Sequence, residues 1–299
     1  MDSFGVLIIG LGNIALGYDL YDEHKVWTHV KAILTHPKFH VIAGIDPNGI
    51  KRSRFEKATH KSSFANLENF ESYNNGELAR QVDVVVIATP TEYHMSQYYD
   101  VLHLKPKLVL MEKPVSDEWQ DTDAQALRNS DCKVMVNLFR LYQRQVNELL
   151  ERYSHGVCEI QARYSQSALH NGIHFYSLIE RHFGQPISGS CEMIENGQRF
   201  DFEFKQGSML LSPCQFGVED NSLIVHSCQG SLYYLSGGRH AFYIDKNMVQ
   251  HDFDEDDLMR YQYKVYDQCL HVLEGGDDDS LELALSAQKR LLERYHEVV

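Results

Sequence analysis

Short apolar runs alternate with helix-like segments through the first 115 residues, and this alternation constrains the fold more than any other feature. The apolar runs do not alternate with polar residues, which is typical of strands buried on both faces of a parallel sheet. They cover residues 6–9, 40–45, 82–88 and 108–111, and the helix-like segments cover residues 28–35, 49–60, 92–103 and 118–129. Repeated strand–helix–strand units wind right-handedly, so we expect an α/β domain on a doubly wound parallel sheet, to which residues 133–136 add a strand.

The second half of the chain has a different pattern, because several of its segments alternate apolar and polar residues. Such segments favour strands of a sheet with one open face, and the pairs Asn196-Gly197 and Gly237-Gly238 supply turns. We expect strands at residues 157–166, 187–195, 200–204, 208–211, 223–227 and 231–236, and helices at residues 141–153, 172–183, 256–273 and 280–298. This pattern predicts an α+β domain with a large open, mainly antiparallel sheet.

Charge and composition exclude several classes of protein. The 42 acidic and 28 basic residues give a net charge of −14, which disfavours binding to nucleic acid and to anionic membranes. The apolar runs are shorter than the ~20 residues that span a bilayer, and the N-terminus lacks the basic start of a signal peptide. The six cysteines are scattered without a C-x-x-C pair, as in proteins of a reducing compartment. We therefore expect a cytoplasmic protein with no nucleic-acid or membrane partner, and solvated loops at the acidic stretches 252–257 and 277–279.

A glycine-rich turn follows the first expected strand. Residues 10–15 read Gly-Leu-Gly-Asn-Ile-Ala, and this spacing, G-x-G-x-x-A, binds dinucleotides where a strand passes into a helix. Gly10 makes the tight turn, Gly12 lets a pyrophosphate approach the backbone, and the helix N-terminus offers N–H groups to the phosphates. Glycines at strand ends also form ordinary turns, but the context favours a dinucleotide bound by Gly10, Gly12, Asn13 and Ile14.

Asp46 ends the next expected strand and is the candidate for binding the adenosine ribose. It follows Gly10 by 36 residues, where ~20 is usual, and an inserted loop over residues 17–27 accounts for the surplus. An acidic side chain there favours NAD(H), because it repels the 2′-phosphate of NADP(H). Lys51 and Arg52 follow closely enough that NADP(H) is not excluded. The alternative is that Asp46 only caps the following helix.

Several short motifs are specific when taken together, in this order and spacing. They are the turn at residues 10–15, Ile45-Asp46-Pro47, Ala88-Thr89-Pro90 with His94, Glu112-Lys113-Pro114, and Gly172-Ile173-His174 with Leu178 and Phe183-Gly184. With these motifs the chain resembles the Gfo/Idh/MocA oxidoreductase family over essentially its whole length. The resemblance implies a dinucleotide-binding Rossmann domain over residues 1–120 and a substrate-binding and oligomerisation domain over residues 121–299. It also implies a homo-oligomer, a dimer or tetramer, formed through the C-terminal sheet.

The resemblance further implies an activity and its residues. Such proteins transfer hydride between a nicotinamide cofactor and a hydroxyl or keto carbon of a sugar, cyclitol or nucleotide-linked sugar. Carried over, Lys113 lies beside the nicotinamide and the reacting carbon, and His174 exchanges the proton. The chemistry agrees, because an ammonium stabilises a developing alkoxide and an imidazole exchanges protons near pH 7. The resemblance adds further cofactor contacts from Thr89, Pro90, His94, Glu112 and Lys113.

The catalytic motif is incomplete in this chain. Relatives carry an Asp one helical turn before the histidine and an acidic residue three positions after it, but this chain has His170 and Ser177 there. Asn171 is adjacent and can hydrogen-bond a substrate, although it exchanges no proton. Either His170 joins the proton transfer, or the substrate differs, or activity is lost and the chain is a non-catalytic NAD(P)-binding regulator. A lyase or hydrolase that oxidises its substrate transiently, or a metal enzyme, is a further class.

Other candidate residues have competing structural roles. His170 and His174 have the i, i+4 spacing of a metal-binding pair, but the sequence identifies no third ligand, and we expect no metal. Arg140 and Arg163 either bind an anionic part of the substrate, such as a sugar-linked phosphate, or form surface salt bridges. His29 stands near an expected cofactor loop, where such a histidine more often caps or packs than reacts.

Overall fold

The computed structural model describes residues 3–214 and 220–296. The chain forms two compact units, and each unit combines segments that are far apart in the sequence. The first unit consists of Met1–Asn137 and Arg260–Leu281, and the second consists of Leu138–Met259 and Glu282–Val299. Each unit has its own sheet and its own core.

The first unit is built on a six-stranded sheet in which all neighbouring strands are parallel. Its strands are β1 (Phe4–Ile9), β2 (Phe39–Ile45), β3 (Ser63–Phe64), β4 (Val84–Ile87), β5 (Leu108–Met111) and β6 (Lys133–Val136). The spatial order β3-β2-β1-β4-β5-β6 changes direction between β1 and β4, and doubly wound sheets bind their ligands at that switch point. The expected parallel sheet is confirmed, with β3 as an additional edge strand.

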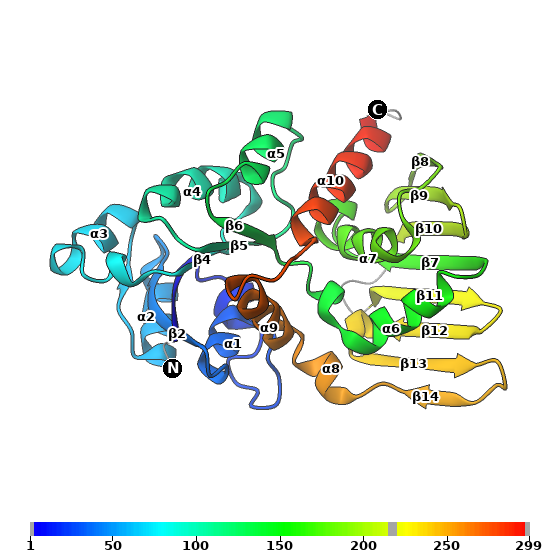
Figure 1. The fold of residues 1–299 in the computed structure, drawn as a ribbon, viewed down its shortest axis with the longest axis horizontal. Coiled ribbons are helices and arrows are strands. Elements are labelled where there is room, and N and C mark those ends of the chain that lie inside the picture. Colours follow the sequence, from blue (N-terminus) through cyan, green and yellow to red (C-terminus); the bar gives the residue numbers. More distant parts are fainter. Residues whose placement is uncertain (1–2, 215–219, 297–299) are drawn as a thin grey trace. The chain divides into compact units, whose positions relative to one another are not determined.

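Six α-helices belong to the described residues of this unit, and three of them begin at a side-chain cap. They are α1 (His29–Thr35), α2 (Gly49–Thr59), α3 (Leu67–Ser72), α4 (His94–Val101), α5 (Asp121–Arg128) and α9 (Tyr261–Leu273). Thr28 and Asn48 accept hydrogen bonds from the first N–H groups of α1 and α2, which would otherwise lack partners. Although α9 comes from near the end of the chain, it packs beside α1 (Figure 1).

The second unit is built on an eight-stranded sheet with the order β14-β13-β12-β11-β7-β10-β9-β8. Its strands are β7 (Cys158–Tyr164), β8 (Ser188–Ile194), β9 (Gly197–Phe204), β10 (Gly207–Pro213), β11 (Ser222–Ser227), β12 (Gly230–Leu235), β13 (His240–Asp245) and β14 (Gln250–Asp252). All neighbours are antiparallel except β7 and β10, which are parallel. The expected mainly antiparallel sheet is therefore confirmed.

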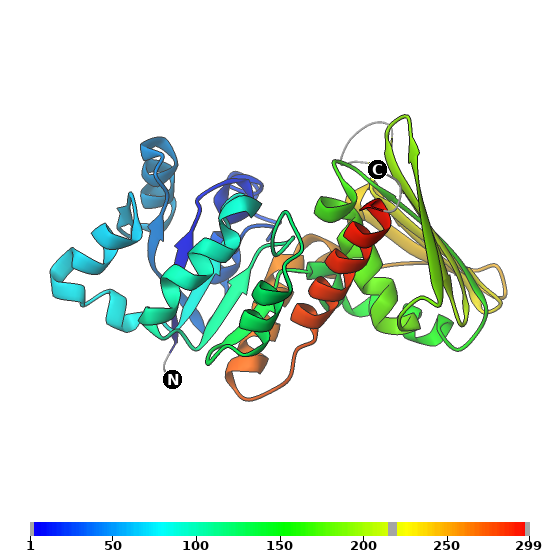
Figure 2. The ribbon, with the colours of Figure 1, turned by 90° about the horizontal axis from the view of Figure 1, so that it is seen from above.

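One face of the second sheet is covered and the other is open. The helices of this unit are α6 (Arg144–Tyr153), α7 (Ile173–Phe183), α8 (Glu255–Met259) and α10 (Ser280–His296). Figure 2 shows α7 and α10 on the same side of the sheet. The central strand β7 buries every second residue and exposes Glu159, Gln161 and Arg163 between them. Within the described residues, no helix has both the length and the apolar character needed to cross a membrane.

Two expectations for the region around residue 257 are wrong. The single helix expected over residues 256–273 is broken at Arg260, whose φ of −119° and ψ of 31° are not helical, so it forms α8 and α9 instead. The acidic stretch 252–257 is not simply a solvated loop, because Asp257 is buried. Its two carboxylate oxygens accept hydrogen bonds from the backbone N–H groups of Arg144 and Gln145, each at 3.1 Å. Asp257 thus satisfies the first donors of α6 from a distant part of the chain.

Candidate functional site

The glycine turn after β1 has the geometry of a phosphate-binding turn. Gly10 has a φ of +90°, and a β-carbon built on it would lie 2.5 Å from the carbonyl group of Ala88, so only glycine fits there. A β-carbon on Gly12 would meet no atom within 4 Å, which leaves this stretch of backbone open to a ligand. Residues Asn13–Gly17 then form one π-helical turn, and α1 begins at His29. This confirms the inserted loop expected over residues 17–27 and the helix expected over residues 28–35.

Asp46 follows β2 and contacts the glycine turn directly. Its buried carboxylate accepts a hydrogen bond from the N–H of Leu11 on Oδ2 and one from the N–H of Asn48 on Oδ1, both at 2.9 Å. The ammonium of Lys51 lies 3.4 Å from Oδ2. A carboxylate offers about four acceptor positions, so the hydroxyl groups of a ribose can still be accommodated. The structure therefore brings Asp46 and the turn together.

His94 connects the loops that follow β4 and β5. Its ring is buried, with Nδ1 2.8 Å from the carbonyl oxygen of Pro114 and Nε2 2.9 Å from that of Thr89. The hydroxyl group of Thr89 is also buried, and it has no hydrogen-bond partner among the described residues. A buried polar group of this kind indicates a ligand or a water molecule. His94 thus orders the two loops, and the hydroxyl group of Thr89 remains available to hydrogen-bond a ligand.

Glu112 and Lys113 follow β5 at the carboxyl edge of the parallel sheet. Burial acts to raise the pKa of Glu112, but the hydrogen bond from His29, the charge of Lys113 and a hydrogen bond from Asn137 outweigh it. The pKa of Glu112 therefore lies below its ordinary value. At neutral pH this places an ionised, buried carboxylate next to Lys113 in the chain, while the lysine itself is half-buried.

A buried network of side chains surrounds Glu112. Its Oε1 accepts a hydrogen bond from Nδ2 of Asn137 at 2.6 Å and lies 3.1 Å from Nε2 of His29. The same Asn137 nitrogen donates to Gln262 at 3.2 Å. The amide nitrogen of Gln262 lies 3.1 Å from Nδ1 of His29, and the hydroxyl of Tyr266 lies 3.2 Å from it. Because an amide nitrogen only donates, Nδ1 must accept, and the ring proton sits on Nε2, facing Glu112.

Three members of this network are absent from the sequence-based candidates. Asn137 follows β6, and Gln262 and Tyr266 come from α9, so they meet Glu112 only through the fold. The local sequence offers one indication, a polar residue at a helical position that is fully buried, Gln262. Such a residue must have a hydrogen-bond partner in the core, but the sequence does not identify that partner.

In the second unit, His174 lies at the start of α7 and is buried. Its ring packs against Phe139, with 4.8 Å between the ring centroids. Ser177, which occupies the place of the family's acidic residue, is also buried, and its hydroxyl lies 3.5 Å from the carbonyl oxygen of Leu283. Ser177 is thus a packing residue of α7 and α10.

The residues just before His174 are held by local hydrogen bonds. His170 lies in the π-helical turn Ala168–Gly172, and its Nδ1 is 2.7 Å from the hydroxyl of Ser167. The amide nitrogen of Asn171 donates to the carbonyl oxygen and the hydroxyl of Ser165, at 3.1 and 3.0 Å. Among the described residues, no group of three or more side chains is arranged to hold a metal ion.

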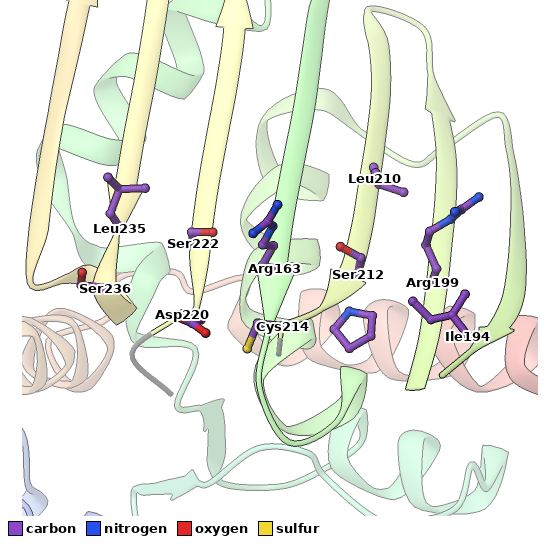
Figure 3. A pocket seen from close by; sticks show the side chains of 11 residues that line it. Arg163, Ile194, Arg199, Leu210, Ser212, Cys214, Asp220, Ser222, Leu235 and Ser236 are labelled. Atoms are coloured by element: carbon purple, nitrogen blue, oxygen red, sulfur yellow. The ribbon is translucent and has the colours of Figure 1, made fainter. Parts of the chain in front are cut away.

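The structure does not bring the two candidate arginines together. Arg140 is buried on the helix-covered face of the second sheet, against Phe175 and Tyr234. Arg163 points from the open face into a hollow of about 690 Å³ (Figure 3). Tyr164, the neighbour of Arg163 in β7, is buried on the opposite face.

The strand order, the glycine turn at the switch point and the acidic residue bound to that turn define a dinucleotide-binding Rossmann protein. Residues 4–138 match the model of a family described as an oxidoreductase family with an NAD-binding Rossmann fold. Over these residues, a little under half of the chain, the resemblance to the Gfo/Idh/MocA oxidoreductase family seen in its motifs is confirmed. No curated protein matches the chain in sequence.

Solved structures share the fold over nearly the whole chain. A putative NADPH-dependent oxidoreductase from Desulfitobacterium hafniense has a TM-score of 0.75 at 17% identity, covering 100% of this chain and 96% of its own. The WlbA dehydrogenase from Bordetella pertussis, in complex with NADH and UDP-GlcNAcA, has a TM-score of 0.71 at 16% identity, covering 99% and 95%. KijD10, a 3-ketoreductase from Actinomadura kijaniata in complex with NADP, has a TM-score of 0.71 at 14% identity, covering 96% and 95%. At these identities the comparison defines the fold.

Proposed function

We propose that this chain is a cytoplasmic oxidoreductase that transfers hydride between NAD(H) and a hydroxyl or keto carbon of a sugar, cyclitol or nucleotide-linked sugar. The first unit binds the cofactor and the second binds the substrate. The hydrogen bond from Leu11 to the Asp46 carboxylate carries this proposal, because it joins the ribose-binding candidate to the pyrophosphate-binding turn. The open space at Gly12 and the buried hydroxyl of Thr89 fit the same cofactor.

The charge of Asp46 supports NAD(H) as the preferred cofactor, because a carboxylate repels the 2′-phosphate of NADP(H). Lys51 offsets part of that charge at 3.4 Å, so NADP(H) is the weaker alternative. Both forms occur among proteins of this fold, since the WlbA dehydrogenase structure holds NADH and the KijD10 structure holds NADP.

When bound, the nicotinamide supplies or accepts the hydride. The substrate oxygen then gains or loses a proton, and Lys113 stabilises the negative charge that develops on it. The ionised Glu112 favours the ammonium form of Lys113, and the network around Glu112 fixes the turn that carries both residues. In this proposal His174 exchanges the proton and His170 extends the transfer, while Asn171 and Arg140 are substrate contacts. Arg163 lies on the opposite, open face of the sheet and is not a contact of the same substrate.

The test is turnover. Full-length protein with NAD⁺ is assayed at 340 nm against UDP-linked sugars, uronic acids and inositols, with UDP-GlcNAcA first because the WlbA structure contains it. Lys113→Ala and His174→Ala should each lower kcat by about 100-fold or more, roughly 3 kcal/mol of barrier. Lys57→Ala, an exposed change on α2, is the control and should leave kcat unchanged. If His174→Ala folds normally and keeps full activity, the proton transfer belongs to another residue and His170 is tested next.

The incomplete motif supports a second candidate function. His170 and Ser177 replace the acidic residues of the family's motif, and Ser177 is committed to packing. A non-catalytic regulator on this fold would bind NADH tightly yet give no change at 340 nm with any substrate of the panel. Tight binding of NADH without turnover would therefore favour this candidate over the dehydrogenase.

The open face of the second sheet supports a homo-oligomer. Leu210, Ile224, Tyr233 and Phe242 lie at its centre, half-buried and not fully covered, and the rings of Tyr233 and Phe242 stack with 4.9 Å between centroids. Arg163, Arg199 and Asp220 line a hollow at one end of the face, and Glu159, Glu203 and His226 line a hollow at the other. Arg199 is already paired with Glu192 and Asp201. Arg163 is therefore the cation that a two-fold axis through the centre would place opposite the Glu159 end of a second copy.

A further inference from the structure

Arg140 is a buried cation with no counter-ion among residues 3–214 and 220–296, which the structure describes. Only 4% of its surface is exposed. Its guanidinium carbon lies 4.5 Å from the ring centres of Phe139 and Phe175 and 5.4 Å from that of Tyr234. Across the described part of the chain, the guanidinium makes no hydrogen bond or ion pair, and its enclosed Nε faces no acceptor.

In this arrangement no described residue compensates the positive charge of Arg140 or accepts hydrogen bonds from its guanidinium. The three rings attract the charge, but they offer no acceptor of ordinary strength to the five N–H donors of the guanidinium. A buried charge is costly unless a group of opposite charge accompanies it. Arg199, by contrast, lies 3.1 Å from Glu192 and 3.5 Å from Asp201. The acceptor that completes Arg140 must therefore come from outside the described chain.

The position of Arg140 connects it to the proposed substrate site. The ring of Phe139 packs on the guanidinium at 4.5 Å and on the ring of His174 at 4.8 Å. One aromatic side chain thus holds both the arginine and the histidine proposed to exchange the proton. A substrate that reaches His174 from this unit has a positive charge beside it.

We propose that Arg140 binds an anionic group of the substrate, a carboxylate or a phosphate, so that the substrate is an acidic sugar. This inference rests on the proposed function, since it assigns the charge of the substrate in that site. A carboxylate or phosphate accepts two parallel N–H bonds from a guanidinium and neutralises it, whereas a sugar hydroxyl does neither. The guanidinium is planar by its own delocalisation, and the rings packed against it hold it in place, which lowers the ordering cost of binding.

The experiment is calorimetric titration of the full chain saturated with NADH, using D-glucuronate, D-glucose 6-phosphate and D-glucose as probes. We expect at least one anionic probe to have an affinity at least about tenfold higher than that of D-glucose. This factor corresponds to the strength of a hydrogen bond to a charged group. The better of the two anions identifies the carboxylate or the phosphate as the group. Arg140→Met should remove this preference, and Arg140→Lys should keep part of it. Arg152→Met, an exposed change on α6, is the matched control and should bind as the unmodified protein does.

Three results would overturn the proposal: D-glucose binding as tightly as both anions, unchanged anion affinity in folded Arg140→Met, or no binding of either anion, which would mean that water satisfies Arg140. The comparison of probes on the unmodified protein needs no variant, so it decides even if Arg140→Met does not fold. A failure of NADH to bind would count against the proposed function instead. The same titrations without NADH would then still test Arg140.

Discussion

At the scale of single residues, Asp46 has two roles: its carboxylate orders the glycine turn, and it offers hydrogen-bond acceptors to a ribose. Asp46→Ala removes both, so we expect NAD⁺ to bind more weakly by on the order of 1–3 kcal/mol, the strength of hydrogen bonds to a charged group. Calorimetry with NAD⁺ and NADP⁺ checks this, and the loss should be smaller for NADP⁺ because Lys51 remains. Asp117→Ala, an exposed change, serves as control. If Asp46→Ala bound NAD⁺ as tightly as the unmodified protein does, Asp46 would not be a cofactor contact.

Glu180 of α7 gives a prediction about stability and pH. Burial raises its pKa above the ordinary value, although a hydrogen bond from Ser286 and the charge of Arg290 act to lower it. A raised pKa in the folded state means that the protonated side chain is favoured there. The contribution of Glu180 to the free energy of unfolding is present below the pKa of the unfolded state, about 4.3. It is lost as pH rises through the higher pKa of the folded state.

The variant Glu180→Gln keeps an acceptor for Ser286 and cannot ionise. We expect it to be more stable than the unmodified protein at pH 8, by on the order of 1 kcal/mol, with the advantage shrinking toward pH 4. Urea unfolding across this pH range measures the difference. An advantage that stays constant with pH would show that Glu180 does not titrate in the folded protein.

At the scale of elements, the Glu112 network ties the end of β5 to α1 and α9. Removing one partner of a buried ionised group leaves it uncompensated, so His29→Ala should destabilise the protein by about 3–5 kcal/mol. The lowered pKa of Glu112 has the opposite sign to that of Glu180. Its contribution is present above the unfolded pKa, about 4.3, and is lost as pH falls through the folded pKa.

A double-mutant cycle separates the network from simple loss of volume. Urea unfolding of His29→Ala, Glu112→Gln and the double variant gives the coupling energy between the two side chains. We expect His29→Ala to cost clearly less in the Glu112→Gln background, where no charge is buried. Additive effects would mean that the two side chains are energetically independent.

Elements with a strong local signal could be predicted from the sequence. The strands β4 and β5 consist only of apolar residues, all fully buried, and such runs identify central parallel strands without further information. β14 has three residues, two of them exposed, and its local pattern carries no comparable signal. The break at Arg260 was missed because residues on both sides of it favour a helix.

The site divides in the same way. The glycine turn, Asp46 and the turn at residues 112–114 are local motifs, so their spacing could be recognised. The partners of Glu112, and the Phe175 and Tyr234 rings beside Arg140, come from segments more distant in sequence. No local pattern encodes those contacts, because side chains on separate elements meet only after the sheets have formed. Arginine and histidine candidates could be named from the sequence, but not their surroundings.

At the scale of the whole molecule, the open face of the second sheet predicts self-association. We expect a dimer or larger oligomer at micromolar concentration, measured by light scattering after size-exclusion chromatography. Arg163→Glu should weaken it by placing like charges opposite each other, and so should Glu159→Arg. The double variant restores opposite charges across the two-fold axis and should restore association. A monomeric unmodified protein, or variants that associate equally well, would contradict this interface.

The first unit is discontinuous, and this has a consequence for how the protein is made. During translation β1 to β6 are synthesised early. Gln262 and Tyr266 of α9 emerge only after the whole second sheet has been synthesised. Until then His29 and Glu112 lack part of their surroundings, and the face of α1 that α9 covers is bare. The nascent chain therefore carries an unfinished cofactor domain through most of translation. A gene cut after residue 137 would encode this domain without its last helix, whereas a circular permutant that begins in the segment after β14 would synthesise α9 first.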